Sequence, residues 1–286
     1  SSSKAAGAAP VGISRRRAAA WTLATATAVA SVTFGMARTF IAPAPLEPAA
    51  TSRFAITLPP SQRMPTILQD RDLAISPDGR HMVYRVGGSA DGGPLALRGL
   101  SELEGRLLPG VDNARSPFFS PDGRWIGFFT TSELNTGLEL KKISIEGGPP
   151  ITIARNVDPE AGASWDGDDS IIVEDAGGGL VRVAAAGGEP APFVAADPDG
   201  ITYYRFVSVL PEGRGVLLTV RSSVNTWFSD ASDAHVNVLD PKTGELKSLV
   251  RGSTPKYVPV SAHAGYLVYA SAGTLFGAHF DLDRLA

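Results

Sequence analysis

The chain has 286 residues, a net charge of −3 and no cysteine, so disulfide bonds and thiolate metal sites are excluded. The first 38 residues hold five basic residues and no acidic one, which leaves −8 for the remainder. A mildly acidic body lacks the basic face that nucleic-acid binding needs. The 31 glycines and 22 prolines favour short strands and tight turns over a helical bundle.

The N-terminal region contains a candidate membrane segment. Residues 18–37, AAAWTLATATAVASVTFGMA, are uncharged and have the length of a transmembrane helix. Because Arg15–Arg17 directly precede them, the positive-inside bias predicts a cytoplasmic N-terminus and an exported body. Residues 1–17 then form a flexible basic juxtamembrane linker, and the proline-rich residues 38–53 form an extended spacer.

Two other interpretations of this segment stay open, because four threonines and many alanines make it only weakly apolar. It could be a signal peptide cleaved after a small-x-small stretch such as Ala28-Val29-Ala30. It could also be a soluble alanine-rich helix. The membrane anchor is the interpretation that the length and the basic flank favour.

Residues 54–286 repeat a turn motif. SPDGR occurs at 76–80 and at 120–124, and related turns occur in WDGDDS and LPEGR. Their acidic residues, Asp78, Asp122, Asp168 and Glu212, are spaced by 44, 46 and 44 residues. A period of this length with four strands per repeat is typical of a β-propeller.

Each unit has the same order of expected strands. In the third unit, for example, GASW is followed by SIIVED, GLVRVA and APFVA, with Gly187-Gly188 before the last strand. We therefore expect an all-β fold of four-stranded blades near 71–110, 116–155, 162–196 and 203–251, with an incomplete blade at 257–286. The early strand RFAITL (53–58) could close this ring, or the chain could be a piece of a larger ring.

The turn residues have a mechanical explanation. Proline fixes φ, aspartate bonds its own backbone two residues on, and glycine accepts φ values that other residues resist. The predicted structural turn residues are Pro77, Asp78, Gly79, Pro121, Asp122, Gly123, Asp168, Glu212 and Gly213. The aromatic residues beside the second turn, Phe118, Phe119, Trp125, Phe128 and Phe129, have strand periodicity, which indicates packing between blades.

The fourth unit carries an insertion, residues 220–234, between its second and third strands. Binding residues tend to lie on long loops of rigid scaffolds. Asn225, Trp227, Phe228 and Asp230 are therefore the candidate binding residues, for a protein or small-molecule ligand that the sequence does not identify.

No catalytic motif is found in the sequence. There is no kinase Gly-rich loop, HRD or DFG motif, no Walker A loop and no G-x-S-x-G elbow, since GASWD at 162–166 lacks the last glycine. The four histidines lack zinc-ligand spacing, and the DGDD of 166–169 falls at a hairpin turn without the calcium-loop pattern. We expect no catalytic residue, no cofactor and no metal in this chain.

The repeat resembles TolB-type, WD-repeat-like propellers, and more closely the extracytoplasmic propeller of bacterial receptor-type serine/threonine kinases. The matching stretches are LPGVDNARSPFFSPDGRWIGFF (108–129), LKKISIEGGPPITI (140–153), GASWDGDDSIIVEDAGGGLVRVAAAGGEPAPF (162–193) and GTLFGAHFDLDRL (273–285). The resemblance implies a kinase domain before Ser1. It also implies a single-pass protein of the bacterial cytoplasmic membrane, with the propeller outside as a sensor or interaction domain.

Two features depart from that pattern. Tyr204-Arg205-Phe206-Val207 stands where relatives carry a His-Arg-Trp-Pro-like sequence, so no role of that histidine carries over. Such propellers also usually continue past the FDLDRL-like segment, which favours a piece of a larger ring. The alternative functions are an exported TolB-like scaffold protein with a signal peptide, and the propeller of a prolyl-oligopeptidase-type peptidase.

Overall fold

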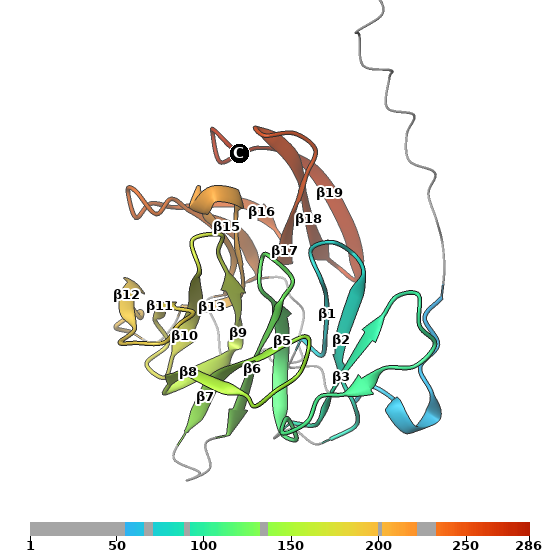
Figure 1. Ribbon diagram of the computed structural model, residues 1–286. Coiled ribbons are helices and arrows are strands. Elements are labelled where there is room, and N and C mark those ends of the chain that lie inside the picture. Colours follow the sequence, from blue (N-terminus) through green and yellow to red (C-terminus); the bar gives the residue numbers. More distant parts are fainter. Residues whose placement is uncertain (1–54, 66–70, 89–91, 132–136, 200–201, 222–232) are drawn as a thin grey trace, which may run out of the picture. The chain divides into compact units, whose positions relative to one another are not determined.

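The computed structural model describes residues 55–65, 71–88, 92–131, 137–199, 202–221 and 233–286 (Figure 1). The chain divides into two units, Ser1–Ile56 and Thr57–Ala286, and all the described strands belong to the second. The predicted linker, membrane segment and spacer lie outside the described residues. Within the described ranges, no helix is long and apolar enough to cross a membrane.

The second unit is an all-β, five-bladed propeller of mostly four-stranded antiparallel sheets, which follow one another in chain order (Figure 1). Blade 1 comprises β1 (Leu73–Ile75), β2 (His81–Arg85), β3 (Leu95–Gly99) and β4 (Arg106–Leu107). Blade 2 comprises β5 (Ala114–Phe119), β6 (Trp125–Thr131), β7 (Leu138–Ser144) and β8 (Ile151–Arg155). Blade 3 comprises β9 (Val157–Trp165), β10 (Ser170–Asp175), β11 (Leu180–Ala184) and β12 (Ala191–Val194). Blade 4 comprises β13 (Tyr203–Val209), β14 (Val216–Arg221), β15 (His235–Leu239) and β16 (Leu246–Arg251), and blade 5 comprises β17 (Ser253–Pro259), β18 (Ala264–Ser271) and β19 (Thr274–Asp281). Short 3₁₀ turns, η1 (Pro60–Gln62) and η2 (Pro211–Gly213), complete the elements.

The first strand of each sheet lies innermost, because β1, β5, β9, β13 and β17 contact one another in succession. The second strands of blades 1 to 4 are rich in apolar residues and deeply buried: the first five residues of β10 are all buried, as expected for strands covered on both faces. The fourth strands are outermost, and Leu107, Ile151 and Leu246 on them are exposed.

The core is divided into clusters between neighbouring blades. Between blades 2 and 3, for example, Phe129 and Leu140 pack with Ile171 and Val173, all fully buried. Burying one such side chain contributes about 1.5–3 kcal/mol. Equivalent clusters join blades 1 and 2, 3 and 4, and 4 and 5. Each blade therefore depends on its neighbours for the burial of its faces.

The innermost strands of blades 2 to 5 share a bulge. Ser116, Gly162, Phe206 and Thr254 have φ of +47°, +72°, +56° and +53°, and the pairing with the second strand shifts register beside each of them. Pairing resumes before the bulge, so β9 begins at Val157 and β17 at Ser253. These strands thus begin several residues before the approximate blade starts expected from the sequence, near 162 and 257.

The segment before blade 1 covers part of that blade. Leu58 and Met64 pack against a cluster that contains Met82, Tyr84, Val86 and Ala96. The Tyr84 hydroxyl donates to Oε1 of Gln62 (2.7 Å), and Nε2 of Gln62 donates to the Gly105 carbonyl (2.7 Å). The described residues of the early segment, 55–58, form no strand, and the described part of the last sheet is β17–β18–β19. Closure of the ring by RFAITL is therefore not seen.

Candidate functional site

The two SPDGR motifs form the same hairpin turn. In blade 2, Oδ1 of Asp122 accepts hydrogen bonds from the Ser120 hydroxyl (2.6 Å) and the Arg124 amide (3.0 Å). In blade 1, Asp78 accepts the same bonds from Ser76 and Arg80 (2.6 and 3.0 Å). The hydrogen bond from Ser120, with help from Arg124, lowers the pKa of Asp122 to about 2. These contacts all lie within the turn, which leaves the carboxylates a structural role.

In the turns of blades 3 and 4, the acidic residue is held by a different set of hydrogen bonds. Asp168 accepts from the amide and hydroxyl of Ser170 (3.0 and 2.6 Å). The longer Glu212 accepts instead from the side chain of Arg214 (3.1 and 2.8 Å) and has φ +59°. Gly213, at φ +63°, lies close to blade 3: a Cβ there would lie 3.0 Å from Oδ2 of Asp166, a tight contact.

Pro77, Gly79, Pro121 and Gly123 also lie in these turns. Gly79 and Gly123 have φ of +68° and +70°, which glycine adopts without cost to side-chain sterics. Their amides donate to the carbonyls of Ser76 and Ser120 (2.9 Å each). All the predicted turn residues thus lie at hairpins between the first two strands of a blade.

The aromatic residues of 118–129 pack between blades. Phe128 and Phe129 are buried, and Phe118 meets Trp165 edge-on at a ring distance of 6.2 Å. The Lys142 ammonium lies 4.6 Å from the ring centre of Trp125 and 5.9 Å from that of Trp165. This stack joins blades 2 and 3 and leaves no open aromatic platform at the turn.

The predicted binding residues Asn225, Trp227, Phe228 and Asp230 lie outside the described residues. The base of their loop is described. β14 and β15 stay paired up to Val220 and His235, and just beyond them Arg221 and Asp233 form an ion pair of 3.4 Å. The loop therefore leaves the sheet from two adjacent, hydrogen-bonded strand ends.

An uncovered apolar face on blade 5 is a feature that the sequence analysis missed. Leu275, Val258 and Tyr266 are 74%, 47% and 43% exposed. Register places Val258 opposite Tyr266, and Tyr266 opposite His279. The alternate residues Leu267 and Phe280 are buried against blade 4. We call the exposed set, Val258, Tyr266, Leu275 and His279, the blade 5 free face.

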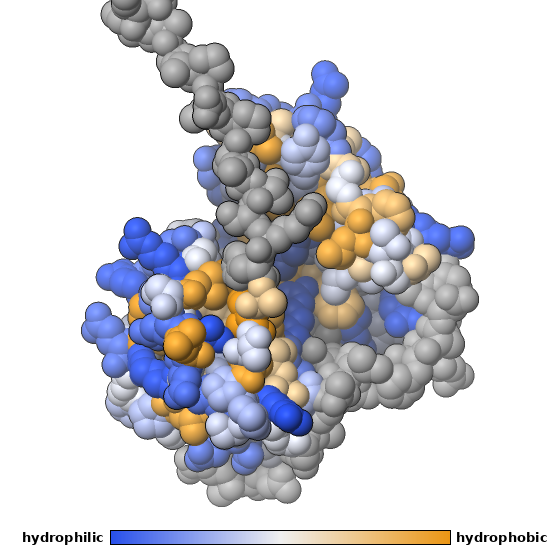
Figure 2. Space-filling model, turned by 90° about the vertical axis from the view of Figure 1, so that its right-hand side faces the viewer, coloured by the Kyte–Doolittle hydropathy of each residue, from blue (hydrophilic) through white to orange (hydrophobic). Residues whose placement is uncertain are grey.

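Blade 1 has exposed apolar residues on its corresponding inner strand, where Leu73 is 41% and Ile75 54% exposed. Figure 2 looks onto the side of the molecule where β18 and β19 lie above β2 and β3 in Figure 1, and it shows apolar atoms on both sides of a hollow. The sequence contained a signal for this surface: the strand TLFGAHFDL has apolar residues in both alternation phases.

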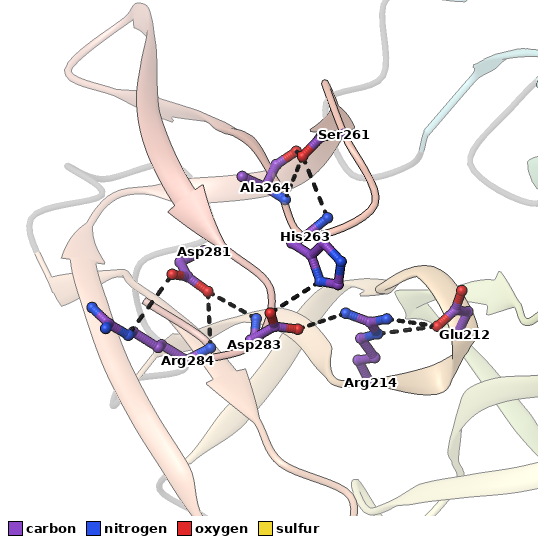
Figure 3. Close-up of polar contacts among 8 residues, drawn as sticks. All are labelled: Glu212, Arg214, Ser261, His263, Ala264, Asp281, Asp283 and Arg284. Carbon is purple, nitrogen blue, oxygen red and sulfur yellow. Dashed lines mark hydrogen bonds and ion pairs between the residues drawn. The ribbon is translucent and has the colours of Figure 1, made fainter. Parts of the chain in front are cut away.

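A polar network joins the turns of blades 4 and 5 (Figure 3). Arg214 bridges Glu212 and Asp283, the latter at 2.8 Å, and Nδ1 of His263 lies 3.0 Å from Oδ2 of Asp283. Hydrogen bonding to Glu212 raises the pKa of Arg214 above its usual value. The network fixes the last turn of the chain to blade 4.

Ser261, His263 and Asp283 combine the residue types of a hydrolase triad, but their arrangement differs. The Ser261 hydroxyl accepts from the backbone amides of His263 (3.4 Å) and Ala264 (3.1 Å) (Figure 3). It therefore caps its own turn, whereas a nucleophile must hydrogen-bond to the base that activates it. All three residues are exposed, without the water-excluded site that such chemistry uses.

A groove of about 840 Å³ lies between the rims of blades 2 and 3. It is lined by β8, by the residues from Arg155 to Val157 and by the Gly187-Gly188 turn. Arg155 is held by Glu139, at 2.9 Å, and Asp175 accepts from the amides of Gly177 and Gly179. Two of its charged side chains, Arg155 and Asp175, are thus engaged with the protein. Among the described residues, no group of three or more His, Asp or Glu side chains could hold a metal ion.

No protein-family model matches the chain, and no curated protein matches it. Solved structures match in fold. A protein named as TolB from Agrobacterium tumefaciens superposes with a TM-score of 0.53 at 14% identity, over 74% of this chain and 76% of that one. TolB from Acinetobacter baumannii gives 0.49 at 18% identity, over 73% of this chain and 55% of that one.

A prolyl endopeptidase structure gives a TM-score of 0.45 at 13% identity, over 73% of this chain and only 33% of that protein. At these identities the comparisons show the fold alone. The chain has a TolB-like β-propeller fold, as the sequence analysis predicted.

Proposed function

We propose that this chain is a non-catalytic protein-interaction propeller, the exported and membrane-anchored sensor part of a bacterial receptor-type serine/threonine kinase. The observation that supports the interaction role is the blade 5 free face. Within the ring, the neighbouring blade covers the matching face of blades 2, 3 and 4. Exposed apolar surface of this kind is typical of protein–protein contact sites.

The packing of neighbouring blades indicates what kind of strand would cover the blade 5 free face. A blade face in this molecule is covered by the innermost strand of the next blade, with apolar residues at alternate positions. We therefore expect a strand of that pattern to cover Val258, Tyr266 and Leu275, supplied by a following blade of the same protein or, as we propose, by a partner protein. Binding there outside the membrane would bias the association of the cytoplasmic domains.

A cross-linking experiment tests the interaction role. A photo-reactive amino acid at Leu275 in the full chain should give one discrete adduct in cells, and Val258→Ser should abolish it. The same amino acid at Lys242, which is exposed on the turn between β15 and β16, is the control. Equal labelling from both positions, or an adduct insensitive to Val258→Ser, contradicts the proposal.

Reporter fusions test the anchor. Alkaline phosphatase fused after Ala286 should be active, and the fusion should resist alkaline extraction from membranes. Replacing Arg15, Arg16 and Arg17 by Glu should reduce export, because the basic flank orients the segment. An inactive phosphatase fusion would place the propeller in the cytoplasm and end this proposal.

The second candidate is an exported TolB-like scaffold protein, and the small-x-small stretch Ala28-Val29-Ala30 supports it. N-terminal sequencing of the mature protein separates the two candidates. Cleavage near Ala30 favours the scaffold, and an intact N-terminus favours the anchor. An in-frame kinase domain upstream of Ser1 is the further requirement of the first candidate, and an in-frame G-x-S-x-G domain downstream is that of a peptidase propeller.

A further inference from the structure

Two cations of the propeller centre, Arg71 and Lys256, have no carboxylate partner among the described residues. Arg71 lies two residues before β1, the innermost strand of blade 1, and Lys256 lies on β17, the innermost strand of blade 5. The other basic residues of this region are engaged: Arg85 pairs with Asp72 at 2.7 Å, and Arg205 with Glu174 at 3.3 Å. These two carboxylates thus pair with Arg85 and Arg205 and not with Arg71 or Lys256.

The side chain of Arg71 crosses the centre of the ring. Its guanidinium carbon lies 5.1 Å from the ring centre of Phe206, on the innermost strand of blade 4. A Cβ built on Gly162, on the innermost strand of blade 3, would lie 3.6 Å from its Nη1 atom. Both residues occupy the bulges of their strands. The guanidinium thus lies within van der Waals reach of the bulged strands of blades 3 and 4.

Lys256 shares this environment. It follows the bulge at Thr254 on β17, and β17 contacts β13, which carries Phe206. Desolvation lowers the pKa of Arg71 to about 10, and desolvation together with the charge of Arg71 lowers that of Lys256 to about 8. Lys256 nevertheless keeps exposed surface. The Lys256 side chain is exposed and Arg71 is half-buried, so a solute can reach both cations.

We propose that Arg71 and Lys256 form an anion site at the centre of the propeller, which binds a small, doubly charged oxyanion such as a phosphate or a dicarboxylate. The planar guanidinium offers paired N–H donors that match the oxygen atoms of a carboxylate or phosphate, and the ammonium offers a compact point charge. The Phe206 ring lies 5.1 Å from the guanidinium carbon and attracts its charge. The site is separate from the blade 5 free face, and its test does not depend on the proposed partner.

Calorimetric titration of the purified full chain in detergent tests the site. Inorganic phosphate and succinate are titrated separately at constant ionic strength in chloride. We expect saturable binding, and Lys256→Met should weaken it about tenfold or more, because a hydrogen bond between charged groups is lost. Lys242→Met, at an exposed lysine on a peripheral turn, should bind as the wild type does.

Two further measurements on variants distinguish a loss of anion binding from a loss of the fold. Arg71→Lys retains the charge but loses the paired donors, so it should weaken binding while keeping the fold. Lys256→Met without added anion should be at least as thermally stable as the wild type, since it removes a like-charge contact. Absence of saturable binding of either anion to the wild type, or equal affinities of the wild type and Lys256→Met, would overturn the proposal.

Discussion

Blades 1 and 5 differ in how their outward apolar faces are covered. The outer part of the blade 1 face is covered by the chain itself, where Leu58 and Met64 pack on Met82 and Tyr84. The blade 5 free face has no such cover in the described part of the chain, and Leu275 is 74% exposed. An apolar sheet face is thus buried where a neighbouring segment packs side chains against it, and exposed where no segment does. The contrast indicates that the described chain itself covers blade 1, whereas blade 5 leaves its apolar face open to a further segment or a partner.

Truncating the covered face should have the largest effect. Tyr84→Ala removes a fully buried ring and its bond to Gln62, and should lower the free energy of unfolding by about 3–5 kcal/mol. Urea denaturation measures this. Tyr266→Ala on the blade 5 free face is the matched control and should stay within about 0.5 kcal/mol of the wild type. Equal losses at the two sites would remove the distinction between the blades.

Removing part of the cover should have an intermediate effect. Met64 is half-buried against blade 1, so Met64→Ala should cost about 1–2 kcal/mol, less than the full burial value. Hydrogen exchange should then accelerate in β2 and β3 rather than in β18 and β19. Acceleration confined to blade 5 would contradict the assignment of the segment to blade 1.

The turns allow a smaller test. The blade 2 turn is held by Asp122, whereas the blade 5 turn relies on Ser261. Asp122→Ala should cost about 1 kcal/mol at pH 7, and Asp112→Ala, at an exposed residue, almost nothing. The folded pKa of Asp122 is lowered to about 2 from 3.8, so its carboxylate stabilises the fold above pH 4. That contribution is lost as the pH falls from 4 to 2. The gap between the two variants should close over that interval, followed by thermal melting.

The smallest effect on stability is expected at the most exposed position. Leu275→Ser should change the free energy of unfolding by less than about 0.5 kcal/mol, because the side chain has few contacts to lose. It should nevertheless reduce cross-linking from a photo-reactive amino acid placed at Tyr266. A loss of several kcal/mol would mean that Leu275 supports the fold, and that the blade 5 free face is not a free surface.

The sequence predicted the structural features that repeat from blade to blade. The spacing of Asp78, Asp122 and Asp168 predicted the positions of the hairpins. The strand β10, Ser170–Asp175, has the expected bounds because its run of apolar residues directly follows a predicted turn. The bulges were not predictable, since Ser116, Gly162, Phe206 and Thr254 share no residue type. Their left-handed conformations follow from the curvature of the ring rather than from local preference.

The candidate surfaces were predicted less well, because they depend on residues that are distant in the sequence. The approach of Arg71 to Phe206 joins blades 1 and 4, and the pair of Arg205 with Glu174 joins blades 4 and 3. No spacing rule connects such residues. The blade 5 free face had a pattern in TLFGAHFDL, but whether an apolar strand face is covered depends on its neighbours and not on its own residues.

The ion pair between Arg221 and Asp233 has a practical consequence. It closes the ladder of β14 and β15 at the point where residues 222–232 begin and end. Sequences inserted between two joined strand ends leave the pairing beneath them intact, and a longer insert adds little closure entropy. This position is therefore suited to carry an affinity tag, a fluorescent protein or a peptide epitope on a five-bladed scaffold.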